Sequence, residues 1–148
     1  MFYTLYFARG LTCVDFLNKI TCLLDPGYLV LSGGTKKIEV TTDAFDFSVV
    51  CGINSLEMLS KEYEINFNSK CTFELNLEND ACVEKVIEFV GNFANIFTVD
   101  FVLQSNGERF VAIRKDGNIS VSASLEKSGF PFNLLKSNYS MSTIRELI

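Results

Sequence analysis

The side chains that could carry chemistry in this chain are carboxylates and thiols, because its 148 residues include no histidine. Without histidine, neither a Ser–His nor a Cys–His nucleophilic pair can form, and the commonest zinc ligand is missing. Carboxylates occur in close pairs, namely Asp43 and Asp46, Glu62 and Glu64, and Glu84 and Glu88. Acid–base catalysis by such a pair needs two different environments, so that one carboxyl group keeps its proton. The neighbouring residues do not predict burial of either member, and the pairs therefore indicate a solvated surface.

The cysteines are odd in number and show no CxxC or other metal-binding spacing. They are Cys13, Cys22, Cys51, Cys71 and Cys82. We expect free thiols that act as small apolar residues, and only Cys82, close to an expected helix start, partly meets the conditions for a reactive thiol. The Gly-Gly segment 32–37 lacks the GxxxxGK(S/T) order of a phosphate loop. The sequence therefore predicts no catalytic set, no metal site and no cofactor.

The composition narrows the range of partners. With 13 basic and 18 acidic residues, the net charge of −5 would repel nucleic acid and anionic membranes and favour a basic partner. Solubility is the simpler explanation of this modest acidity. The 14 phenylalanines and five tyrosines indicate core packing, because base-stacking platforms lie in basic grooves. Since no basic region precedes the apolar run at the N-terminus, we expect no secretion signal, no membrane segment and a cytoplasmic location.

The clearest pattern along the chain begins at Cys71 and predicts a strand, a helix and three further strands. Residues 71–77 alternate apolar and polar side chains, as in a strand with one buried face. From Asp80 to about Ala94, apolar residues recur at helical spacing, and Asn79 or Asp80 can cap the first turn. Asn-Gly and Asp-Gly turn signals then separate three β-rich runs, an antiparallel meander. These runs are 97–104, 109–114 and 119–124.

The N-terminal part predicts a similar order of a strand, a helix and a hairpin. Residues 2–8 form the expected strand, and Thr12 and Asp15 suit the reciprocal cap of a helix that ends at 25–27. Further expected elements are strands at 28–31, 37–42, 45–51 and 65–67 and a short helical turn at 55–61.

We therefore expect one α+β domain over residues 1–148, a length that suits a single core. A mostly antiparallel β-sheet would carry two main helices packed on one face, because helices and hairpins alternate without repeated parallel crossovers. The segment 129–148 is expected to be an irregular, partly mobile tail, with one helical turn over 142–148.

Several short motifs of this chain occur together in one known family. They are the Y-x-L strand of Tyr3-Thr4-Leu5, the F-x-L strand of Phe73-Glu74-Leu75, the apolar strand after Asp100, the N-G-E turn of Asn106-Gly107-Glu108 and the R-x-x-G turn of 114–117. With these motifs the chain resembles the swarming-inhibition immunity proteins of bacteria. The resemblance covers about half of the chain and does not extend to 42–69.

The resemblance implies a small protein without a reaction of its own, which binds and neutralises one cognate toxin delivered by neighbouring cells. Toxins of such systems are often basic nucleases, and an acidic surface would steer and pair with one. The candidate partner-binding residues are the acids near the meander, Glu78, Asp80, Glu84, Glu88, Asp100 and Glu108. We call the first four the helix group, and they are the first to test.

Two other hypotheses remain open at this point. The aromatic content also suits a small-ligand-binding or enzymatic domain with an aromatic-lined pocket and a carboxylate. The several β-rich runs must leave edges, which suits a homodimer formed through an exposed strand.

Overall fold

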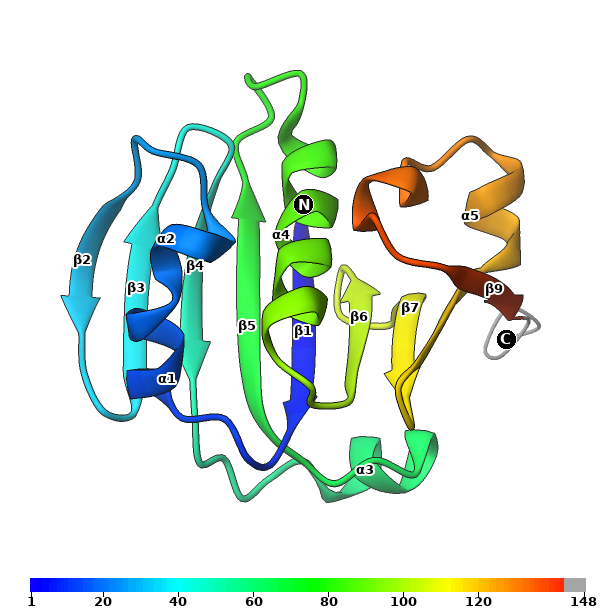
Figure 1. The fold of residues 1–148 in the computed structure, drawn as a ribbon, viewed down its shortest axis with the longest axis horizontal. Coiled ribbons are helices and arrows are strands. Elements are labelled where there is room, and N and C mark those ends of the chain that lie inside the picture. The colour runs from blue at the N-terminus through cyan, green and yellow to red at the C-terminus, as the bar shows by residue number, and fades with distance from the viewer. Residues whose placement is uncertain (143–148) are drawn as a thin grey trace.

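The computed structural model describes residues 1–142, which form one open nine-stranded sheet in the order β2-β3-β4-β5-β1-β6-β7-β8-β9 (Figure 1). Neighbouring strands are antiparallel throughout, except for β8 and β9, which are parallel. The strands are β1 (Phe2–Ala8), β2 (Leu29–Gly33), β3 (Lys37–Thr41), β4 (Phe45–Val50), β5 (Phe67–Leu75), β6 (Phe101–Ser105), β7 (Arg109–Lys115), β8 (Asn118–Ser122) and β9 (Tyr139–Ser142). The helices are α1 (Cys13–Asn18), α2 (Ile20–Leu23), α3 (Glu57–Tyr63), α4 (Cys82–Ile96), α5 (Ala123–Lys127) and the 3₁₀ turn η1 (Phe132–Leu135).

The N-terminal strand β1 lies at the centre of the sheet and joins its two halves. It pairs with β5, where Leu5 faces Cys71, and with β6, where Leu5 faces Leu103. On one side the meander β2-β3-β4 continues from β5, and on the other β7 and β8 continue from β6. The expected α+β class, with a mostly antiparallel sheet and two main helical segments, is confirmed.

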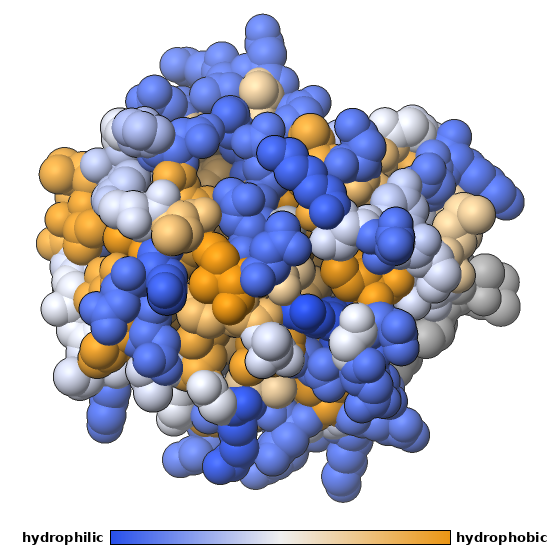
Figure 2. Space-filling view, viewed as in Figure 1, coloured by the Kyte–Doolittle hydropathy of each residue, from blue (hydrophilic) through white to orange (hydrophobic). Residues whose placement is uncertain are grey.

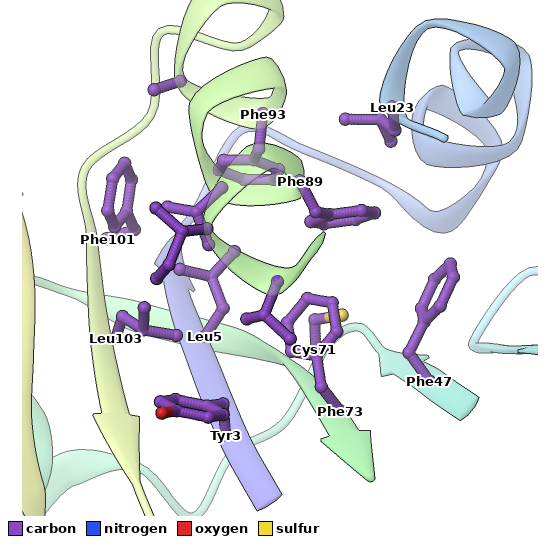
Figure 3. Packing of buried hydrophobic residues seen from close by; sticks show 14 of the residues in the cluster. Tyr3, Leu5, Leu23, Phe47, Cys71, Phe73, Phe89, Phe93, Phe101 and Leu103 are labelled. Atoms are coloured by element: carbon purple, nitrogen blue, oxygen red, sulfur yellow. The ribbon is translucent and has the colours of Figure 1, made fainter. Parts of the chain in front are cut away.

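One face of the sheet is covered by α1, α2, α4, α5 and η1, and it holds the main core. Figure 3 shows that Phe89 and Phe93 of α4 point down onto the central strands. The Phe89 ring lies 5.0 Å from that of Phe73, and the Phe93 ring lies 5.4 Å from that of Phe7. Phe16 of α1 packs 6.0 Å from Phe89, so both helical segments share one aromatic cluster.

The opposite face is covered only in part, by α3 and the chain that follows it. A smaller apolar cluster lies there, made of Tyr63, Ile65, Phe67, Val102, Phe110 and Ile113. Gln104 is also buried on this face, and its side-chain amide donates to the hydroxyl of Tyr63 at 3.1 Å. Beyond this cluster the face carries polar residues of β3, β4 and β5.

The helices α1 and α4 differ in how their first turns are capped. Thr12 and Asp15 form the predicted capping box at the start of α1. At α4, Asn79 accepts a hydrogen bond from the Ala81 amide, just before the helix begins, and no side chain caps the first turn. Arg114 of β7 donates to the carbonyl oxygens of Ala94 and Phe97 at 2.8 and 2.7 Å, which places a cation at the negative end of the helix dipole.

Several parts of the fold differ from the expectation. Residues 67–75 form one continuous strand, β5, rather than parts of two, and Ala123 and Ser124 begin the helix α5 instead of ending a strand. The predicted first helix is broken at Lys19 into α1 and α2, because the Lys19 amide bonds to the Phe16 carbonyl and its own backbone leaves the helical region. Residues 129–142 are also more regular than the irregular tail that we expected, since they form η1 and β9 and bury Phe132. The helical turn expected over 142–148 lies outside the described residues apart from Ser142, which ends β9.

The close contact between α4 and η1 depends on the absence of a side chain at Gly91. A Cβ atom at this position would lie 2.6 Å from the carbonyl oxygen and 2.9 Å from the Cα of Leu135. We expect Gly91→Ala to lower the free energy of unfolding by about 2 kcal/mol, although alanine favours helices by about 1 kcal/mol over glycine.

Urea unfolding would measure this effect, with Asn95→Ala on the exposed side of the same helix as the matched control. The control should be neutral or slightly stabilising. A Gly91→Ala protein as stable as the control would contradict the close contact.

Candidate functional site

Three carboxylates lie on the uncovered part of the sheet, one on each of three neighbouring strands. Glu39 of β3, Asp46 of β4 and Glu74 of β5 alternate with buried residues that face the main core, so they point away from it. We call these three residues the acidic face. Asp46 and Glu74 are direct cross-strand partners, and Glu39 pairs with Ser48, two residues from Asp46.

The acidic face is only partly neutralised. Glu39 forms an ion pair with Lys37 at 2.9 Å, but both side chains are exposed, so the pair contributes less than about 1 kcal/mol. Asp46 accepts a hydrogen bond from the Thr41 hydroxyl. Within residues 1–142, no lysine or arginine forms an ion pair with Asp46 or Glu74. Like charges directly opposite each other in a sheet are destabilising. The Asp46–Glu74 pair is therefore expected to lower the free energy of unfolding of the isolated protein.

A shallow depression of about 250 Å³ lies over these strands. Its polar lining consists of Glu39, Asp46, Ser48, Thr72 and Glu74. Leu31, an extra residue at a bulge in β2, adds an apolar side chain at the rim. Carboxylates and hydroxyls in this arrangement suit lysine or arginine side chains, since charge-assisted hydrogen bonds from arginine to carboxylate are strong and directional.

The six acidic residues that the sequence suggests for partner binding lie outside the acidic face. Glu78 and Asp80 lie in the β5–α4 connection, and Glu84 and Glu88 lie half-buried on α4, on the helical side of the sheet.

The remaining two candidates lie beside opposite ends of the central strand β1. Glu108 belongs to the turn beside Phe2, because the Asn106 amide bonds to the Phe2 carbonyl. Asp100 lies at the other end of β1, because its carbonyl accepts from the Ala8 amide. The length of β1 separates the two by about 20 Å. The six candidates therefore do not form one compact surface, and their role in binding stays a prediction.

A second depression, of about 280 Å³, lies between α2, α4 and the start of β4. Phe45 and Phe89 contribute to its lining, and Asp25, Lys85 and Glu88 contribute charged groups. Lys85 donates to Asp25 at 3.0 Å and to Glu88 at 3.3 Å. The hydrogen bond to Asp25, with a smaller effect of Glu88, raises the pKa of the Lys85 ammonium group. The lysine is thus held as a cation between two carboxylates.

One edge of the sheet exposes apolar side chains. Leu29 and Leu31 of β2 are each 60% exposed, and Val30 is 38% exposed. Figure 2 shows orange surface along the margin where Figure 1 places β2. Because an edge strand also has unpaired backbone groups, β2 is a surface on which another strand can add.

Other kinds of site find no support in the part of the chain that the structure describes. There, no three His, Cys, Asp or Glu side chains are grouped in a way that could hold a metal ion. No helix within residues 1–142 has both the length and the apolar character needed to cross a membrane. Cys82, the candidate for a reactive thiol, is buried at the first residue of α4.

The fold defines the chain as an α+β domain with a nine-stranded sheet, one closed face and one partly open face. Comparison with known proteins adds no assignment, since no family model, no curated protein and no solved structure matches this chain.

The opposed carboxylates of Asp46 and Glu74 give a prediction about stability. We expect Glu74→Gln to raise the free energy of unfolding by about 0.5 kcal/mol at low salt, because it removes one of two like charges at a cross-strand pair. The gain should shrink in high salt, where the repulsion is screened.

Urea unfolding at two salt concentrations would test this, with Glu108→Gln in the exposed β6–β7 turn as the control. A Glu74→Gln protein that is less stable than the unmodified chain at low salt would show that the two charges do not oppose each other.

Proposed function

We propose that this chain is a non-catalytic immunity protein, which binds a cognate bacterial toxin in the cytoplasm and neutralises it. The observation that carries the proposal is the acidic face, where Asp46 and Glu74 lie opposite each other without a cationic partner among the described residues. Because the two carboxylates repel each other in the isolated protein, a partner that places positive charge beside them would remove this repulsion and form favourable ion pairs.

The chemistry of the acidic face favours a basic partner, such as a nuclease toxin. A nuclease that contacts phosphates needs lysine or arginine side chains on its substrate-binding surface. The carboxylates on neighbouring strands, with the hydroxyls of Ser48 and Thr72 beside them, can accept hydrogen bonds from several such side chains. The net charge of −5 would also speed the encounter with a basic protein.

The family resemblance suggests the same proposal, and in this structure its motif residues lie in turns and at a helix end. Asn106 of the N-G-E turn accepts a hydrogen bond from the Phe2 amide at 3.1 Å, and Gly107 has a φ of +87° that suits glycine. Arg114 of the R-x-x-G turn holds the end of α4. These motif residues therefore have structural roles, and they leave the binding surface to be found by experiment.

The natural test is binding to the protein encoded beside this chain in its genome. We expect the Asp46→Lys and Glu74→Lys variants to bind it about 10- to 100-fold more weakly in calorimetry, because each places a cation against a basic partner. The unmodified complex should weaken as salt is raised.

The matched controls are Glu84→Lys and Glu88→Lys from the helix group, which make the same charge change on the other face. If these weaken binding and the acidic-face variants do not, the interface is the helix group. If the unmodified protein forms no tight complex and its expression does not protect cells from the neighbouring protein, the immunity proposal fails.

A small-ligand-binding or enzymatic domain is the second candidate, and the depression beside Lys85 is what favours it. That site combines aromatic lining with carboxylates, but its volume of about 280 Å³ is at the lower limit for ligand pockets. A thermal-shift screen of small cationic and anionic metabolites on the unmodified protein and on Lys85→Ala would distinguish this candidate from a protein-binding role.

A homodimer through β2 is a separate prediction about assembly. Leu29 and Leu31 would be covered if the β2 strands of two copies paired. We expect a dimer of the unmodified protein at high concentration in sedimentation, and a monomer for the double variant Leu29→Lys, Leu31→Lys. A monomer of the unmodified protein at all concentrations would contradict it.

A further inference from the structure

Two cysteines that are distant in sequence meet beside the main core. Cys13 is the first residue of α1 and is buried, whereas Cys51 directly follows β4 and is half-buried. Their Sγ atoms lie 2.8 Å apart, and 38 positions separate them in the chain. A disulfide needs two sulfurs at about 2.05 Å, so little movement would bring these thiols to bonding distance.

We propose that Cys13 and Cys51 form a redox-active dithiol pair, which a low-molecular-weight disulfide such as oxidised glutathione converts to an intramolecular disulfide. In a reducing cytosol the pair would rest as two thiols, and the bridge would form when the thiol pool becomes oxidised.

The exchange takes place in two steps that balance. In the first, the Cys51 thiolate attacks one sulfur of the small disulfide, a mixed disulfide forms on Cys51, and one small thiol leaves with the proton that Cys51 gave up. In the second, the Cys13 thiolate attacks the Cys51 sulfur, the protein disulfide forms, and the second small thiol leaves with the proton of Cys13. The small disulfide is reduced to two thiols, and the protein loses two hydrogen atoms.

The surroundings of the two sulfurs indicate that Cys51 reacts first and Cys13 second. Cys51 is partly exposed at the margin of the core, while Cys13 is fully buried within it. Burial and the hydrogen bond with Cys51 raise the pKa of the Cys13 thiol to about 12, so Cys13 is a poor first nucleophile. Burial also raises the pKa of the Cys71 thiol, which lies close enough to Cys51 to interact electrostatically and is the competing partner.

The bridge would fasten the first helix to the sheet. The closed loop contains α1, α2, β2, β3 and β4, which is the part of the fold that carries Glu39, Asp46 and the exposed edge. Closing a loop of this length restricts the unfolded chain, and we expect the melting temperature to rise by about 10 °C on oxidation.

Peptide mapping identifies the bridge directly. The reduced full chain would be incubated with oxidised glutathione, its remaining thiols blocked, and the protein cleaved with trypsin. Peptide 10–19 contains only Cys13 and peptide 38–61 contains only Cys51, so a linked pair of these two peptides is unambiguous. The intact protein should lose the mass of two hydrogen atoms.

The variants separate the proposal from its alternatives. Cys22→Ser, which changes an exposed cysteine, should keep both the linked peptides and the melting-temperature rise, whereas Cys51→Ser should lose both. Glutathione that remains on Cys51 without a link to peptide 10–19 would overturn the proposal. A link between peptide 38–61 and peptide 71–85 would overturn it as well, because it would assign the bridge to Cys71 or Cys82.

Discussion

The packing of α4 on the central strands is the interaction on which the rest of the structure depends. Phe89 and Phe93 lie against rings from β5 and β1, and Phe16 brings the first helical segment into the same cluster. Arg114 holds the end of α4, and Gly91 lets η1 approach its side. Because all of these contacts lie on one face of the sheet, that face is closed, whereas the opposite face is covered only in part, beside α3.

The division between the two faces links the fold to the proposed function. Alternation along β3, β4 and β5 sends apolar side chains into the main core and sends Glu39, Asp46 and Glu74 to the other side. The segment with α3 covers only the neighbouring part of that side. The closed core thus carries an acidic surface on its other side, which would suit the proposed inhibitor of a basic enzyme.

Local patterns predicted much of the fold, since strand alternation, helical spacing and the Thr12–Asp15 cap each depend on residues close in sequence. The placement of β1 at the sheet centre and the opposition of Asp46 to Glu74 depend on pairing between distant strands, which no local pattern reports. Glu74 and Asp46 are each recognisable from the sequence as polar positions in expected strands, but the sequence does not show that they are cross-strand neighbours. The approach of Cys13 to Cys51 was missed for the same reason, because it follows from where α1 docks.

The central claim is that the acidic face contacts a basic toxin, and amide chemical-shift mapping tests it most directly. The labelled protein would be titrated with the protein encoded beside it, and the backbone signals followed by NMR. The account predicts the largest changes at Asp46, Thr72 and Glu74. Changes confined to α4 and the β5–α4 connection, or no change at all, would contradict it.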